Sequence, residues 1–359
     1  MHGGRRERPP IAVVLMTSLV LWFLILPGGK RPVRRDNPFI DNGPMGDLRL
    51  TAVTRTQGST QALKDGTSRP RHVDLQFEEI PVLIQAFRRM VRSVEWDVCE
   101  MAFTTYLVAK EHGKPFTALP VFLVRGFHHG AVLRSATAGG LVPKDLEGRK
   151  SGVNRGYTVT TGVWARGILA DEHGVDLSRV TWVLSGDEHA AEYQPPPNVI
   201  PAGPGEDVPA MVASGELAAG IGLPADYPGV VPLIPDAAEA GYRALRDRGF
   251  YPINHVLVVR DELLAKHPDL AADLFAAYAD AKKRYVADLA EGFVTDLGPT
   301  DRMYARVMQI TSADPLPYGI APNRAMIDQL IRYAVNQQIL TRAVAAEDLF
   351  PDSTHHLTA

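Results

Sequence analysis

Cysteine is nearly missing from this sequence, and neither sign of charge dominates it. The single thiol, Cys99, excludes an internal disulfide and any cysteine-rich zinc or iron–sulfur site. The chain has 38 lysine and arginine residues against 41 aspartate and glutamate residues, which gives a formal net charge of −3. This balance gives no reason to expect nucleic acid or an anionic membrane surface as a partner.

Several motifs of known chemistry are also absent. The glycine patterns that bind dinucleotides and nucleoside triphosphates do not occur, and neither does the G-x-S-x-G pattern of serine hydrolases. His189 and Glu192 have a spacing of one helical turn, but no third ligand follows and the flanking loop is rich in proline. We therefore expect no cofactor and no bound metal.

The N-terminus carries an apolar segment at residues 11–26, which three arginines precede. This pattern resembles the first two regions of a signal peptide, and the segment is short for a membrane span of about 20 residues. No A-x-A cleavage site follows it. We expect residues 1–45 to form an N-terminal extension. One interpretation is that Met45 is the true start and residues 1–44 are an upstream extension, which favours a cytoplasmic protein. The alternative is export or membrane association through residues 11–26.

A chain of 359 residues exceeds what one hydrophobic core usually supports, so two lobes are expected. Short apolar runs alternate with amphipathic segments from Leu48 onward, which predicts an α/β fold with mostly parallel sheets. The expected strands include 48–53, 180–185 and 253–260, and the expected helices include 81–93 and 158–174.

The last hundred or so residues contain helical patterns only and must pack on existing sheets. Two lobes joined by two crossovers satisfy both observations, with the C-terminal helices, residues 316–333 included, returning to the first lobe. The crossovers are expected near residues 125–132 and 249–257. Residues 46–125 plus 258–359 then form the first lobe and residues 126–257 the second. This is the type II periplasmic-binding-protein architecture, with a ligand cleft between the lobes.

Four stretches carry a family resemblance: LPVFLVRGFHHGAVL, GYTVTTGVWARGILADEHGVD, FYPINHVLVVRDELLAKHP and LPYGIAPNRAMIDQLIRYA. From about residue 46 to residue 350 the chain resembles the 4,5-dihydroxyphthalate decarboxylase family, which is related to the solute-binding proteins of ABC transporters. The resemblance implies the two-lobed fold and matches Thr60 and Thr104 to substrate-binding positions. The chain departs from the family at His128, where an arginine is common, and at Gln57 and Ser59, where a tyrosine and an arginine are usual.

An anion-binding site is predicted around the start of the 158–174 helix. Arg125 and Arg155 follow strands, and a guanidinium binds a carboxylate through paired hydrogen bonds. Tyr157, Thr158 and Thr160 open the helix, whose free N–H groups and positive dipole end attract an anion. In the alternative interpretation the threonines only cap the helix and Arg155 is solvated.

Decarboxylation needs an acid–base group, and histidine serves near neutral pH. His129 and His255 lie on the two expected crossovers, so both could face the cleft. Adjacent strand residues point to opposite faces, so only one of His128 and His129 can point inward, and the resemblance selects His129. Alternatively, both candidates are hydrogen-bonded hinge residues.

The leading hypothesis is therefore decarboxylation of 4,5-dihydroxyphthalate, or a related hydroxylated aromatic carboxylate, to 3,4-dihydroxybenzoate and carbon dioxide. The rival hypothesis is a binding protein that delivers a small carboxylate to an ABC-type transporter. The sequence does not determine the oligomeric state.

Overall fold

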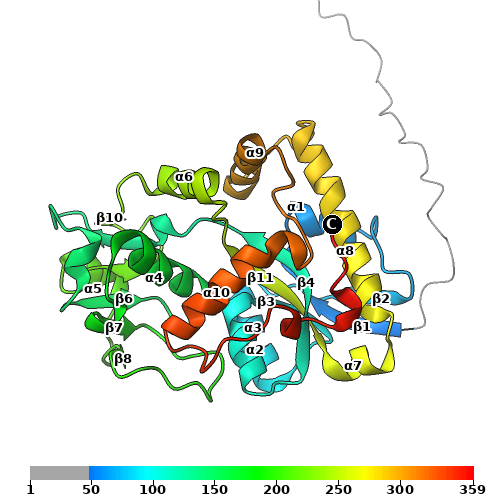
Figure 1. Cartoon of the computed structure of the whole chain (residues 1–359), viewed down its shortest axis with the longest axis horizontal. Helices are drawn as coiled ribbons and strands as arrows, with labels where there is room; N and C mark the ends of the chain where they lie inside the picture. The colour runs from blue at the N-terminus through cyan, green and yellow to red at the C-terminus, as the bar shows by residue number, and fades with distance from the viewer. Residues whose placement is uncertain (1–47) are drawn as a thin grey trace, which may run out of the picture. The chain divides into compact units, whose positions relative to one another are not determined.

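The computed structural model describes residues 48–359. The N-terminal extension predicted at 1–45, including the apolar segment at 11–26, lies outside these residues. In the described part the chain forms two separate β-sheets with helices packed around them, as Figure 1 shows. This is the two-lobed α/β fold that the alternating pattern predicts.

The first sheet has five strands in the order β2-β1-β3-β11-β4. The strands β1, β2 and β3 are parallel, whereas β11 is antiparallel to both β3 and β4. Their bounds are β1 (Leu48–Val53), β2 (Val73–Phe77), β3 (Val98–Ala102), β4 (Phe116–Arg125) and β11 (Ile253–Arg260). All five side chains of β3 are buried, which matches its nearly continuous apolar sequence.

The second sheet has six strands in the order β10-β5-β9-β6-β7-β8. The run β9-β6-β7-β8 is parallel, β5 pairs antiparallel with β9, and β10 pairs antiparallel with β5. Their bounds are β5 (Val132–Ser135), β6 (Lys150–Val153), β7 (Thr181–Leu184), β8 (Val199–Pro201), β9 (Gly220–Ile221) and β10 (Val230–Pro232). The two sheets define the first and second lobes.

The helices predicted at 81–93 and 158–174 are present as α2 and α4, whereas α1 was not predicted. The α-helices are α1 (Gly58–Lys64), α2 (Leu83–Ser93), α3 (Phe103–Glu111), α4 (Thr160–His173), α5 (Val208–Ser214), α6 (Ala237–Arg248), α7 (Asp261–Lys266), α8 (Leu270–Ala290), α9 (Pro299–Thr311) and α10 (Arg324–Asn336). The 3₁₀ helices are η1 (His129–Ala131), η2 (Pro143–Leu146), η3 (Leu177–Arg179), η4 (Ala321–Asn323), η5 (Glu347–Leu349) and η6 (Asp352–Thr354). Gly174 ends α4 in a left-handed conformation with φ 64°, as glycine after a helix predicts.

The chain passes between the lobes twice. The first passage follows β4, and the second precedes β11. We predicted that the second lobe runs to residue 257, but β11 pairs within the first sheet from Ile253 onward. Residues 253–257 therefore belong to the sheet of the first lobe.

After β11 every regular element is helical, as predicted. The expectation that residues 316–333 pack only on the first lobe needs correction. The N–H of Gly319 donates to the Pro120 carbonyl of β4, but α10 packs on α4 of the second lobe (Figure 1). The Tyr333 ring meets Trp164 at a centroid distance of 5.6 Å, and it fits where Gly167 has no side chain.

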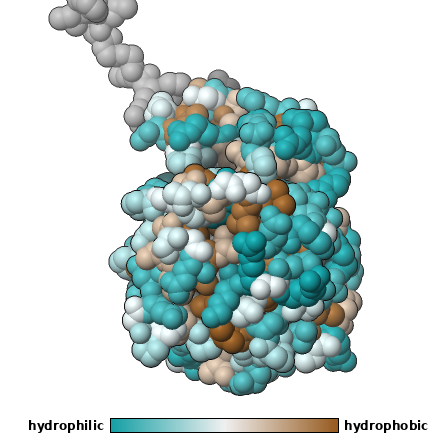
Figure 2. Space-filling model, turned by 90° about the vertical axis from the view of Figure 1, so that its left-hand side faces the viewer, coloured by the Kyte–Doolittle hydropathy of each residue, from teal (hydrophilic) through white to brown (hydrophobic). Residues whose placement is uncertain are grey.

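One continuous cluster of buried apolar side chains extends through both lobes. The face of the second lobe in Figure 2 is mainly hydrophilic, with hydrophobic residues scattered over it. Within residues 48–359, no helix is both long enough and apolar enough to cross a membrane.

Candidate active site

A histidine–glutamate pair lies where β3 and β11 run side by side. His255 Nδ1 is 2.6 Å from Glu100 Oε1. Glu100 pairs with Leu257 across the ladder and His255 pairs with Ala102, so the two side chains are diagonal neighbours on one face of the sheet. The Glu100 side chain is fully buried, whereas the His255 side chain keeps 15% of its exposure.

The Glu100 carboxylate is ionised despite its burial. Burial raises the pKa of this carboxyl group, but the hydrogen bond from His255 and the backbone N–H of Arg55 offset this effect, and the pKa lies below its ordinary value. An ionised Glu100 accepts a hydrogen bond, so the Nδ1 of His255 carries a proton. Within the described residues the Nε2 of His255 has no hydrogen-bond partner. This nitrogen can therefore exchange a proton with a ligand.

The turn after β1 supports this pair. The Arg55 N–H donates to Glu100 Oε2 at 2.8 Å. The buried Thr60 hydroxyl donates to the Arg55 carbonyl at 2.6 Å and accepts the Gln57 N–H at 3.1 Å. Thr60, predicted to bind substrate, thus orders the turn that carries Arg55. The Arg55 side chain is exposed at the carboxyl end of a parallel strand, where ligands bind in such sheets.

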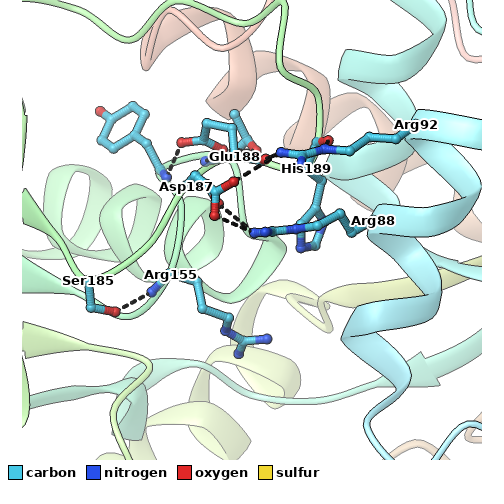
Figure 3. A network of polar contacts seen from close by, with 9 residues as sticks. Arg88, Arg92, Arg155, Ser185, Asp187, Glu188 and His189 are labelled. Atoms are coloured by element: carbon cyan, nitrogen blue, oxygen red, sulfur yellow. Dashed lines mark hydrogen bonds and ion pairs between the residues drawn. The ribbon is translucent and has the colours of Figure 1, made fainter.

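Arg155 is a cation with no partner for its charge within residues 48–359. Its backbone is left-handed, with φ 70°, and its N–H donates to the Ser185 hydroxyl at 2.7 Å. The side chain extends away from Ser185 and ends without a marked contact in Figure 3, and its buried Nε has no hydrogen-bond partner. Burial lowers the pKa of Arg155, but a guanidinium stays charged. Within the described residues the guanidinium is thus free to pair with a carboxylate, and substrate binding by Arg155 stays a prediction.

The start of α4 already holds an anion, which is the carboxylate of Glu188. Glu188 Oε1 accepts the Tyr157 N–H. Its Oε2 accepts the Thr158 hydroxyl at 2.6 Å and the Thr158 N–H at 3.2 Å. The predicted anion-binding groups at Tyr157 and Thr158 are thus present, and the protein's own side chain occupies them.

The residue before Glu188 connects the lobes. Asp187 Oδ1 lies 2.7 Å from Arg88, and its Oδ2 lies 3.0 Å from Arg92. Figure 3 shows the Asp187 carboxylate between these two arginines of α2. Arg92 also donates to the carbonyls of Glu188 and His189. These contacts fasten the loop after β7 to the first lobe.

Two further predicted residues meet between the lobes. The hydroxyls of Thr104 and Thr160 are 2.8 Å apart, and Thr104 donates to the Thr158 carbonyl at 2.5 Å. Both threonines are buried. They join the starts of α3 and α4, so their hydroxyls are already hydrogen-bonded within the protein.

Arg125 lies in the hinge, where protein groups hold its guanidinium. The guanidinium donates to Asn323 Oδ1 at 2.9 Å and to the Tyr251 carbonyl, and it stacks 4.3 Å from the Tyr251 ring. Burial lowers the pKa of Arg125 to about 10, so it remains charged at neutral pH. This position joins the second crossover to η4. Substrate binding by Arg125 stays a prediction.

The predicted orientation of His128 and His129 needs correction. β4 ends at Arg125 and His129 begins the 3₁₀ helix η1, so strand alternation does not govern these residues. The His129 side chain has no exposure, and its Nε2 lies 3.1 Å from Glu172 of α4. The catalytic role of His129 stays a prediction, and this position does not favour it.

His128 lies toward the second crossover. Its Nε2 is 2.9 Å from Asn254 Oδ1, one residue before His255. Burial lowers the pKa of His128 to about 4, although the hydrogen bond to Asn254 opposes this shift. His128 is therefore neutral at physiological pH.

His189 and Phe87 connect the two halves of the site. The Phe87 ring lies 5.1 Å from the His255 ring and 6.3 Å from the His189 ring. Burial, together with the nearby charges of Arg88 and Arg155, lowers the pKa of His189 to about 4. Glu192 is instead paired with Lys114. Among residues 48–359 no group of histidine, cysteine and carboxylate side chains has the arrangement of a metal site.

Sequence reasoning missed Glu100, Asp187 and Glu188. Glu100 stands in an apolar stretch that we interpreted only as a strand, yet a lone acidic residue in a buried strand requires a partner. The need of Glu100 for a buried partner is the signal in the sequence that could have identified it. The loop carrying Asp187 and Glu188 was expected only to be exposed, and nothing in its composition shows that it returns to α4.

The arrangement of the two sheets defines a two-lobed protein of the periplasmic-binding-protein type. Two solved structures share this fold. The periplasmic aliphatic sulphonate-binding protein SsuA from Escherichia coli aligns with a TM-score of 0.50 at 11% identity, covering 85% of this chain and 92% of its own. The desulfurization enzyme DszB, solved with biphenyl-2-sulfinic acid, aligns with a TM-score of 0.50 at 14% identity, covering 85% and 96%.

Sequence comparison gives the family. No family model matches the chain. The 4,5-dihydroxyphthalate decarboxylase of Comamonas testosteroni is 28% identical over 327 residues, which cover 85% of this chain and 97% of that protein. The enzyme of the same name from Pseudomonas putida is 35% identical over 178 residues, covering 45% and 69%. The chain belongs to the 4,5-dihydroxyphthalate decarboxylase family.

Proposed function

We propose that this protein decarboxylates 4,5-dihydroxyphthalate, or a closely related hydroxylated aromatic carboxylate, to 3,4-dihydroxybenzoate and carbon dioxide. The observation that carries this proposal is the His255–Glu100 pair. A buried carboxylate fixes one imidazole nitrogen at 2.6 Å, and the other nitrogen has no partner within the described residues. The two relatives above carry the name of the same reaction.

The substrate class follows from the charges around this pair. Arg155 has no partner for its guanidinium within residues 48–359, and the exposed Arg55 adjoins Glu100. One arginine belongs to each lobe, so a small aromatic dicarboxylate can be bound from both sides. Arginine binds carboxylates with paired hydrogen bonds, and binding from both lobes would keep the ring between them.

The reaction needs one proton at a ring carbon. In 4,5-dihydroxyphthalate each carboxylate is para to a hydroxyl, and loss of that hydroxyl proton to solvent raises the electron density on the carbon that bears the carboxylate. His255 Nε2 donates a proton to this carbon. The carbon–carboxylate bond then breaks, its electron pair returns to the ring, and carbon dioxide leaves. The phenolate regains a proton from solvent after carbon dioxide has left. Glu100 stabilises the positive charge of the protonated imidazole before this transfer.

The test compares turnover with binding. The purified full-length chain is incubated with 4,5-dihydroxyphthalate while carbon dioxide release is followed, and binding is measured by calorimetry. Phthalate is the matched control ligand, because it keeps both carboxylates but lacks the hydroxyls. Turnover of the first and binding without turnover of the second are expected. Tight binding of both with no product would instead identify a solute-binding protein.

The location of the protein stays a prediction. Residues 11–26, on which the cytoplasmic and the exported or membrane-associated alternatives depend, lie outside the described part of the chain. Fractionation of cells that express the full chain would decide between them.

A further inference from the structure

The turn from residue 154 to residue 158 offers two kinds of anion-binding group. The first is the Arg155 guanidinium, whose buried Nε has no partner among the described residues. The second is the pair of N–H groups at Tyr157 and Thr158, together with the Thr158 hydroxyl. Both lie in the second lobe at the carboxyl end of β6, and they are three residues apart at most. If no other side chain occupied these groups, the turn could bind both carboxylates of an ortho-dicarboxylate.

Glu188 removes the second group from use by a ligand. Its carboxylate accepts all three of these hydrogen bonds. The position is shaped for it, because a methyl group added at Gly156 would overlap with both Glu188 carboxylate oxygens. Helix N-termini bind carboxylates through such N–H groups. Here the carboxylate that accepts these N–H groups belongs to Glu188 of the same chain.

The loop that carries Glu188 is held in place from the other lobe. Asp187 pairs with Arg88 and Arg92, and Arg92 also donates to the Glu188 carbonyl at 3.0 Å. Each of these ion pairs is partly exposed, so each alone contributes little to stability. Their shared geometry nevertheless fixes the backbone of Glu188, which keeps its carboxylate directed at α4.

We propose that Glu188 is a specificity-determining residue that divides the two carboxylates of the substrate between the lobes. This inference rests on the proposed function. With the start of α4 occupied, one carboxylate binds Arg155 in the second lobe. The other carboxylate then faces the first lobe, where Arg55 and His255 lie. Glu188 therefore orients the ring so that the carbon to be protonated lies on the His255 side.

The same arrangement favours the chemistry. Negative charge leaves the reacting carboxylate as carbon dioxide forms, so hydrogen bonds from the α4 N–H groups would stabilise the bound substrate more than the transition state. Only interactions that strengthen in the transition state accelerate a reaction. By accepting those N–H groups itself, Glu188 keeps them from the reacting carboxylate.

The experiment measures ligand selectivity in Glu188→Ala by calorimetry with two probes, phthalate and benzoate. The freed N–H groups should bind the second carboxylate of phthalate, so its dissociation constant should fall about tenfold or more. Benzoate has one carboxylate, and its dissociation constant should change less than about twofold. Where 4,5-dihydroxyphthalate is turned over, Glu188→Ala should lower KM and lower kcat.

Two further variants complete the test. Gly156→Ala should displace the Glu188 carboxylate by another route and shift the ratio of phthalate to benzoate affinity in the same direction. Glu192→Gln is the matched control, because Glu192 lies on the same loop but pairs with Lys114, and it should leave the ratio unchanged. An unchanged ratio in both Glu188→Ala and Gly156→Ala would overturn the inference. Absence of carbon dioxide release by the wild type would defeat the decarboxylase proposal alone, because the ratio does not depend on turnover.

Discussion

The molecule contains two histidine–glutamate pairs with opposite patterns of burial. In the pair between β3 and β11, called the sheet pair, Glu100 is fully buried and His255 keeps 15% exposure. In the hinge pair, His129 is fully buried and Glu172 keeps 20% exposure. The Glu172 carboxylate of the hinge pair also binds Arg248. The Glu100 carboxylate instead accepts hydrogen bonds from one histidine and one backbone N–H.

This difference indicates which pair can react. Of the two imidazoles, only that of His255 in the sheet pair is exposed, and the carboxylate behind it is fixed and ionised. In the hinge pair the imidazole lies between Glu172 and the Phe250 ring, 6.3 Å away. Chemistry at histidine requires an accessible ring nitrogen, so the hinge pair is suited to joining η1 to α4 instead.

The largest expected effect separates the two histidines. His255→Gln keeps a donor for Glu100 but loses the acid–base nitrogen, so kcat for 4,5-dihydroxyphthalate should fall about 10²–10⁴-fold. His129→Gln should leave kcat within about twofold, while the free energy of unfolding drops by about 1–3 kcal/mol through weakening of a buried hydrogen bond. Steady-state kinetics and urea unfolding of both variants measure this contrast.

The reverse outcome would be informative. A large loss of kcat in His129→Gln, with native stability and a fully active His255→Gln, would assign the chemistry to the hinge pair. Glu172 would then be the carboxylate that supports the reactive imidazole, and Glu100 would only join two strands.

A smaller effect is expected for Glu100, the carboxylate of the sheet pair. Glu100→Gln keeps the size of the side chain but removes the charge that fixes the His255 tautomer. The value of kcat should fall about 10–100-fold, as for other residues that orient a reactive group. Glu172→Gln is the counterpart in the hinge pair, and an equal loss of kcat there would contradict the comparison.

The smallest expected effect concerns stability against pH and His128. This residue has a pKa of about 4 when folded and about 6.5 when unfolded. Between these values the unfolded chain binds a proton that the folded chain does not, so stability falls as the pH decreases from about 6.5 to about 4, by up to roughly 3 kcal/mol. His128→Asn cannot bind this proton and should lose less stability over the window.

Chemical unfolding at a series of pH values measures this slope. His189, whose pKa is also about 4, remains in the variant, so the slope should decrease and not vanish. The control is His356→Asn, because His356 is exposed. Identical slopes for the wild type and His128→Asn would show that His128 is not held neutral by burial.

Much of the fold could be predicted from local patterns. The strand expected at 253–260 is β11 (Ile253–Arg260), and the helix expected at 158–174 is α4 (Thr160–His173) with its glycine cap. Both have strong local signals, a continuous apolar run in one and a terminal glycine in the other. The position of α10 could not be predicted, because its apolar face fits either lobe and the recess at Gly167 exists only in the folded chain.

The site could be predicted only in part. The sequence indicates His255 and Arg155 as candidates from their places on a crossover and at a strand end, and their roles stay predictions. Glu100, the partner of His255, lies 155 residues away in the sequence. The Nε of Arg155 has no partner among the described residues. Such pairings depend on sheet register and loop path, which no spacing in the sequence encodes.

The packing of α10 has a consequence for motion. Two-lobed proteins admit ligands by rotating one lobe against the other about their crossovers. Here α10 is a third connection, anchored beside the first lobe by Asn323, which binds Arg125, and seated on α4 through Tyr333. Any opening must either carry α10 along with the second lobe or pull the Tyr333 ring out of its recess. Separation of the lobes therefore costs the contact between the Tyr333 and Trp164 rings unless α10 moves with the second lobe.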